Sequence, residues 1–163
     1  MTLATHAVIG AAAAHLFPSH PILAALAAFA SHFAADAIPH WDYHLFSRTA
    51  DPKEPLNNNM AINKLFIVDL FRVGNDFLLG MALSLLIFSW NAPETALFTL
   101  AGAFFGILPD PLQFAYWKLK WKPLEYLQRF HLFIHAKKRI RSPLMGSTAQ
   151  AALVTLIALL FNL

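Results

Sequence analysis

Long apolar stretches make up most of this chain, and each ends at a short run of proline or polar residues. The alanine-rich stretch 3–17 ends at Pro18, and a second apolar stretch runs from Pro21 to about Ile38. Proline fits the first turn of a helix but breaks its interior, so this pattern predicts two consecutive helices. The alternation of apolar and polar residues that is typical of strands persists nowhere in the chain.

Three further helices are predicted, at about 62–90, 93–108 and 148–163. Prolines, aspartates and asparagines fill the stretch 45–63, which is therefore expected to be a loop. The stretch 112–141 mixes aromatic with basic residues, and one or two amphipathic helices lying at a membrane interface are expected there. The predicted fold class is all-α: an apolar bundle of about five main helices plus amphipathic interfacial helices.

Composition favours a membrane as the neighbour of this bundle. The 163 residues, which we expect to form one domain (1–163), are 58% hydrophobic and 13% charged, whereas soluble proteins have roughly 25% charged residues. Mean hydropathy is +0.52. The apolar runs last about 13 to 18 residues, at or below the ~20 that a spanning helix needs. Either the helices cross the bilayer with the help of their polar ends, or they form a buried bundle set against one leaflet.

Charge is distributed unevenly, because eight of the twelve Lys and Arg residues lie between Lys118 and Arg141. Such clustering favours membrane lipid headgroups or a phosphorylated substrate as partners, and no nucleic acid is expected. The candidates for holding phosphate or lipid headgroups are Arg129, Lys137, Lys138 and Arg139. If the helices span a membrane, the excess of basic residues puts this end of the bundle in the cytoplasm.

The highest density of metal-ligand side chains follows the second predicted helix. His32 and Asp36 share one helical face, and the proline at position 39 lets His40 and Asp42 fold back toward them. A helix end with ordinary polar residues is the alternative, but several ionisable groups after an apolar helix need ions or partners that offset the cost of burying charge. The chain has no cysteine, so His, Asp and Glu are its only strong metal ligands.

An up-and-down order of the helices brings the remaining candidates to the same end of the bundle, here called the near end. These candidates are His6, Asp69, Asp76, Asp110, His131 and His135. The opposite end offers only His15, His20 and Glu94. Because bundles commonly bind metals through inward side chains of facing helices, the sequence predicts one polar site at the near end.

Several of these candidates have a second interpretation. His131 and His135 have the spacing of zinc ligands on a helix, but basic residues follow them, and the pair fits a basic amphipathic helix equally well. Asp110 could simply end a helix, and Asp69 and Asp76 could pair with a nearby arginine. Asp76 is favoured over Asp69 as a ligand or general base, because a wholly apolar half-helix follows it.

Three segments, 5–10, 31–42 and 106–110, together with the pair His131 and His135, resemble the bacterial membrane-bound metal-dependent hydrolases, also described as LexA-binding inner-membrane-associated hydrolases. The HxxxD element in a helical chain is more distantly similar to zinc-dependent phospholipase C, although this chain lacks the N-terminal tryptophan of that enzyme. The resemblance implies a helical hydrolase of the bacterial inner membrane that cleaves phosphoesters, lipids among them, with two or more divalent ions and zinc as the expected metal. The ligands that it implies are His6, His32, Asp36, Asp110, His131 and His135. The residue spacing adds His40 to this set.

The predicted function is therefore a metal-dependent hydrolase at the membrane. Bound ions would lower the pKa of a water molecule and stabilise charge on phosphoryl oxygens, while an uncoordinated carboxylate, Asp76 or Asp42, orients that water. One alternative is a non-catalytic membrane protein that binds or transports metal ions through the same side chains. Another is a regulatory membrane protein in which the histidines form a structural polar cluster or sense pH.

Overall fold

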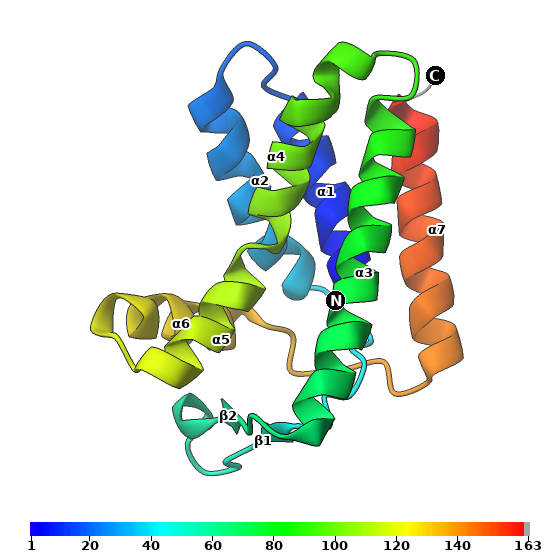
Figure 1. The fold of residues 1–163 in the computed structure, drawn as a ribbon. Coiled ribbons are helices and arrows are strands. Elements are labelled where there is room, and N and C mark those ends of the chain that lie inside the picture. Colours follow the sequence, from blue (N-terminus) through cyan, green and yellow to red (C-terminus); the bar gives the residue numbers. More distant parts are fainter. Residues whose placement is uncertain (162–163) are drawn as a thin grey trace.

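The long helices of this protein lie side by side and alternate in direction, as the computed structural model shows (Figure 1). The structure describes residues 1–161. The bundle is formed by α1 (Leu3–His15), α2 (Pro21–Asp36), α3 (Lys64–Phe88), α4 (Ala96–Ile107) and α7 (Pro143–Phe161). Two shorter helices, α5 (Pro109–Leu119) and α6 (Lys122–Ile134), project sideways from the end at which the chain begins, the lower end in Figure 1. The all-α prediction is confirmed.

The differences from the predicted elements are local. The stretch 45–63 is not wholly a loop, because β1 (Arg48–Thr49) and β2 (Asn59–Met60) pair antiparallel around the 3-10 helix η1 (Pro55–Asn57). Another 3-10 turn, η2 (Pro93–Thr95), precedes α4. The last helix starts five residues earlier than expected, at a proline that fits its first turn. The final two positions of that predicted helix lie outside the described residues.

Small residues let α1 pack closely against α4 at the centre of the bundle. Gly10 of α1 faces Gly102 and Gly106 of α4. A Cβ atom added at Gly106 would lie 2.6 Å from the carbonyl oxygen of His6 and 2.7 Å from the Cα of Gly10. Since real Cβ contacts are longer, this approach of two backbones requires glycine.

Replacing Gly106 with alanine is therefore expected to destabilise the fold by about 1–3 kcal/mol, because the extra methyl group must push α1 and α4 apart. The matched control is Gly74→Ala in α3, where an added Cβ meets nothing within 4 Å. That change should stabilise by up to about 1 kcal/mol, the ordinary helix preference of alanine over glycine. Thermal unfolding of both variants in detergent measures the difference. Equal unfolding temperatures would contradict this close packing.

Helices α3 and α7 bury small and polar residues, and the bundle exposes large apolar ones. The buried residues of α3 are Asp69, Gly80 and Ser84, and those of α7 are Gly146 and Gln150. Large apolar side chains are exposed on the bundle helices, among them Ile22, Leu26, Leu78, Leu86, Leu97, Leu156 and Leu160. Within the described residues, α3 and α7 are long and apolar enough to cross a membrane, and the bent pair α4 and α5 could form a third span.

Candidate metal centre

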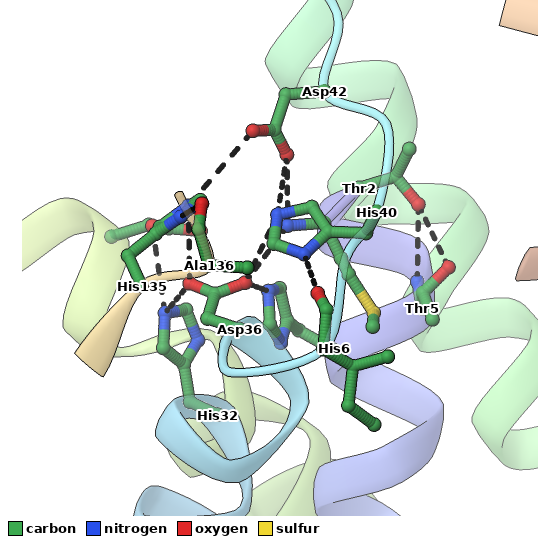
Figure 2. Close-up of polar contacts among 12 residues, drawn as sticks. Thr2, Thr5, His6, His32, Asp36, His40, Asp42, His135 and Ala136 are labelled. Atoms are coloured by element: carbon green, nitrogen blue, oxygen red, sulfur yellow. Dashed lines mark hydrogen bonds and ion pairs between the residues drawn. The ribbon is translucent and has the colours of Figure 1, made fainter. Parts of the chain in front are cut away.

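The carboxylate of Asp36, the last residue of α2, is surrounded by imidazole rings (Figure 2). Its Oδ1 atom lies 3.1 Å from His6 Nε2 and 3.5 Å from His40 Nε2. Its Oδ2 atom lies 2.9 Å from His131 Nε2 and 3.3 Å from His32 Nε2. Asp36 is only 2% exposed, so a single buried carboxylate faces rings on both sides.

These rings come from separate parts of the chain that meet at the near end. His6 lies on α1, His32 on α2, His40 on the connection after α2, and His131 on α6. His135, directly after α6, and Asp110, in the first turn of α5, complete the cluster. Possible ligand atoms in it lie within 4.8 Å of one another in three overlapping groups. The groups are His6, His32 and Asp36; His32, Asp110 and His131; and Asp36, His40 and His135.

Backbone carbonyl groups orient three of the rings. The Nδ1 atom of His32 lies 3.0 Å from the carbonyl oxygen of Gly106, and that of His40 lies 2.7 Å from the carbonyl oxygen of Ile38. His135 Nδ1 lies 3.3 Å from the carbonyl oxygen of the next residue. A carbonyl can only accept, so Nδ1 must donate its proton, and in the neutral ring Nε2 keeps its lone pair. This is the arrangement that metal-binding histidines usually have.

The Nε2 lone pairs of these three rings consequently point into the cluster. His32 Nε2 lies 3.4 Å from His131 Nε2 and 3.7 Å from Asp110 Oδ1. His40 Nε2 is buried without a hydrogen-bond partner, although a carboxylate oxygen of Asp42 lies 3.2 Å away. Lone pairs that converge in this way need a proton or a cation between them. The donor set of imidazoles and carboxylates therefore fits a divalent metal such as zinc.

Asp42 forms the outer edge of the cluster. Its Oδ1 atom lies 2.9 Å from the amino group of Met1, and its Oδ2 atom lies 3.3 Å from an Arg139 guanidinium nitrogen. Burial alone would raise the pKa of Asp42, but contacts with His40 and the Met1 amine outweigh it and hold that pKa well below its usual range. Burial lowers the pKa of the nearby His135 ring, which favours the neutral form that binds metal.

The cluster is partly exposed to solvent. The side chains of His6 and His32 are fully buried, whereas those of Asp110 and Asp42 are 35% and 23% exposed. His135 lies between these extremes. Solvent therefore reaches the cluster at Asp110, Asp42 and His135.

Asp76, predicted to orient a catalytic water, does not lie in the histidine cluster. Its two oxygens accept hydrogen bonds from the backbone N–H groups of Leu3 (2.6 Å) and Ala4 (3.3 Å). Asp76 thus caps the start of α1 from α3, where a carboxylate also interacts favourably with the helix dipole. Asp69 has a similar structural role, since it accepts hydrogen bonds from the backbone of Phe46 and Ser47.

The four predicted substrate-binding cations are placed differently from one another. Arg139 lies at the edge of the cluster, through its contact with Asp42. Arg129 pairs with Glu125 at 2.8 Å on the exposed side of α6. Lys137 and Lys138 are exposed on the connection after α6. Of these four residues, Arg139 alone contacts the cluster.

Sequence reasoning missed several residues that support the cluster. Gln150 of α7 accepts hydrogen bonds from the backbone N–H of Thr2 and the hydroxyl of Thr5, and its amide nitrogen donates to the carbonyl oxygen of Trp41. Gln113 Nε2 lies 3.4 Å from His131 Nδ1. A lone buried glutamine in an apolar helix was the one available signal for Gln150, because such a side chain needs partners.

Comparison with known proteins adds no relative. No protein-family model, no curated protein and no solved structure matches this chain. The buried histidine and aspartate cluster could hold a metal ion, and two helices of the bundle are long and apolar enough to cross a membrane.

Proposed function

We propose that this chain is a membrane-embedded, metal-dependent hydrolase that cleaves phosphoesters. One observation supports this proposal above all others: buried imidazole Nε2 atoms from separate parts of the chain converge on the oxygens of Asp36. Those of His32 and His40 belong to rings whose Nδ1 atoms face backbone carbonyls, so in the neutral rings their lone pairs point at this carboxylate. The Met1 amino group, 3.0 Å from Asp36 Oδ1, supplies one positive charge there. A cluster of this kind is costly in an apolar bundle unless cations occupy it. The sequence resemblance to membrane-bound metal-dependent hydrolases agrees with the same chemistry.

Two ions are the number that the ligand groups accommodate best. The group His32, Asp110 and His131 shares no residue with the group Asp36, His40 and His135. Asp36 Oδ2 also lies 3.3 Å from His32 Nε2 and 2.9 Å from His131 Nε2, so this carboxylate would be within reach of ions held by either group. When bound, zinc or a similar ion would make water acidic enough to supply hydroxide near neutral pH and would stabilise charge on phosphoryl oxygens.

Residues at and near the exposed edge of the cluster would have different roles in the proposed reaction. Asp42 stays ionised, so its carboxylate can hold a water molecule in place by accepting a hydrogen bond from it. Arg139, 3.3 Å from Asp42, can turn its guanidinium group to a phosphate and bind two of its oxygens. Burial and the carboxylates of Asp76 and Asp110 raise the pKa of Tyr43, so its phenol remains a hydrogen-bond donor close to the site.

The proposed location is the bacterial inner membrane, with the cluster on the cytoplasmic side. Exposed leucines on the bundle helices favour a lipid environment, and α3 and α7 have the length and composition of membrane spans. Most basic residues lie between Lys118 and Arg141, at the same end as the cluster. By the positive-inside rule that end faces the cytoplasm, where phospholipid phosphoesters are within reach.

Metal analysis and a substrate panel test this function directly. Purified protein should contain about two zinc or similar ions per chain, as measured by elemental mass spectrometry. It should hydrolyse at least one phosphomonoester or phosphodiester lipid in mixed micelles, lose this activity to a chelator and regain it with added zinc. Protein with no stoichiometric metal, or with full activity after chelation, would contradict the proposal.

A further inference from the structure

Helix α6 has one face that is buried against the cluster and one face that is exposed. Its buried face contains Gln128 and His131, and His131 contacts Asp36. Its exposed face contains an aromatic row, Tyr126, Phe130 and Phe133, at spacings of four and three residues. Tyr126 and Phe133 are 74% and 82% exposed, although large aromatic side chains are normally covered.

Exposed basic side chains flank the aromatic row along the chain. Lys122 lies four residues before Tyr126 and therefore on the same face of α6, and Lys137, Lys138 and Arg141 follow the helix on the connection to α7. The acidic residue of this segment, Glu125, is already neutralised by Arg129. An apolar row with a basic border is complementary to a surface that is apolar within and anionic at its edge, as a leaflet containing anionic lipids is.

The orientation of α6 agrees with such a surface. In Figure 1, α5 and α6 extend across the direction of α3 and α7 at the near end of the bundle. If α3 and α7 cross the membrane, a helix in this position lies in the plane of the interface. Exposed Trp121 and Tyr126 are the aromatic residue types that membrane proteins place at that depth.

We propose that the exposed face of α6 is seated among the headgroups of an anionic leaflet. The membrane location given under the proposed function is required for this inference, whereas the metal ions and the hydrolysis are not. Because the opposite face of the same helix provides His131, headgroups bound at α6 lie one helix diameter, roughly 10 Å, from the cluster. The substrate class that follows is an anionic phospholipid of that leaflet, reached without leaving the bilayer.

Fluorescence quenching, which reports how deep a labelled residue lies in the bilayer, tests whether α6 lies among the lipid headgroups. The chain has no cysteine, so Phe133→Cys gives one attachment point for a polarity-sensitive dye. The protein is reconstituted in vesicles of phosphatidylcholine and phosphatidylglycerol, with nitroxide lipids in the headgroup region or iodide in the water as quencher. We expect blue-shifted emission and several-fold stronger quenching by the nitroxide lipids than by iodide. Tyr126→Cys provides a second position on the same face.

The matched control is Lys53→Cys, on the exposed segment between the two strands, where iodide should quench more strongly. Lys122→Gln combined with Lys137→Gln and Lys138→Gln should reduce the lipid quenching at position 133, and vesicles without phosphatidylglycerol should do the same. A dye at position 133 that behaves like the dye at position 53 would overturn the inference. Self-quenching that grows with protein density would overturn it too, since a second copy would then cover α6. Metal-depleted protein should give the same depth, which separates this test from the test of hydrolysis.

Discussion

Asparagine in place of Asp36 is expected to empty the metal centre and abolish hydrolysis. The substitution keeps the shape of the side chain but removes its negative charge, in a place where five imidazole rings lie within 4 Å of the carboxylate oxygens. Two of the three possible ligand groups include this residue. Metal affinity should fall by more than about 100-fold. Substitutions of residues that only hydrogen-bond to the metal ligands already reduce metal affinity by about 10- to 100-fold. Elemental analysis and the lipid hydrolysis assay measure both losses.

Asp69→Asn is the matched control for this substitution. Asp69 is also a fully buried aspartate, but it holds the backbone of Phe46 and Ser47 and contacts no histidine in the cluster. Its replacement should destabilise the protein by about 1–3 kcal/mol through weakened hydrogen bonds while the bound metal remains. The metal proposal would fail if the two variants lost metal equally, or if Asp36→Asn kept its ions.

Single substitutions on the two sides of Asp36 are expected to remove one ion each. Asp110 belongs only to the group with His32 and His131, and His135 only to the group with Asp36 and His40. Asp110→Asn and His135→Gln should therefore each reduce the metal content from about two ions to about one. Each should slow hydrolysis by at least about 100-fold, because a metal supplies several kcal/mol of charge stabilisation to the transition state. Both side chains are partly exposed, so the fold should tolerate either change.

The control for these variants is His15→Gln. His15 lies at the other end of α1, where its ring is hydrogen-bonded to Thr99 at 2.8 Å. Its replacement should therefore leave the metal content unchanged. Loss of both ions from either single variant would show that the cluster binds metal as one cooperative unit. Retention of both ions would show that Asp110 and His135 are not ligands.

Much of the architecture follows from sequence patterns alone. Prolines at helix starts and uninterrupted apolar runs indicate the bundle helices, and the alternation of their direction predicts that His6, Asp36 and His131 meet. The spacing of His32, Asp36 and His40 predicts correctly that their side chains lie together, because a helical turn followed by a proline bend constrains local geometry strongly. Such local rules do not depend on knowing the tertiary contacts.

The remaining features depend on contacts between distant segments. Asp76 looked like a general base because it precedes an apolar half-helix, and nothing near it in sequence indicates that the backbone of Leu3 and Ala4 would occupy both of its oxygens. The carbonyl group of Gly106 that orients His32 leaves no mark in the sequence, since every residue has one. Roles that are filled by backbone atoms are therefore the hardest to predict from residue types.

The meeting of α1, α2 and α6 at one carboxylate would also have a consequence for stability. Ions held by His6, Asp36, His131 and their neighbours would tie together segments as far apart in the chain as positions 6 and 131. A cysteine-free protein has no covalent ties between such segments. The metal would thus do for this bundle what disulfides do for secreted proteins, by a bond that forms equally well in a reducing compartment.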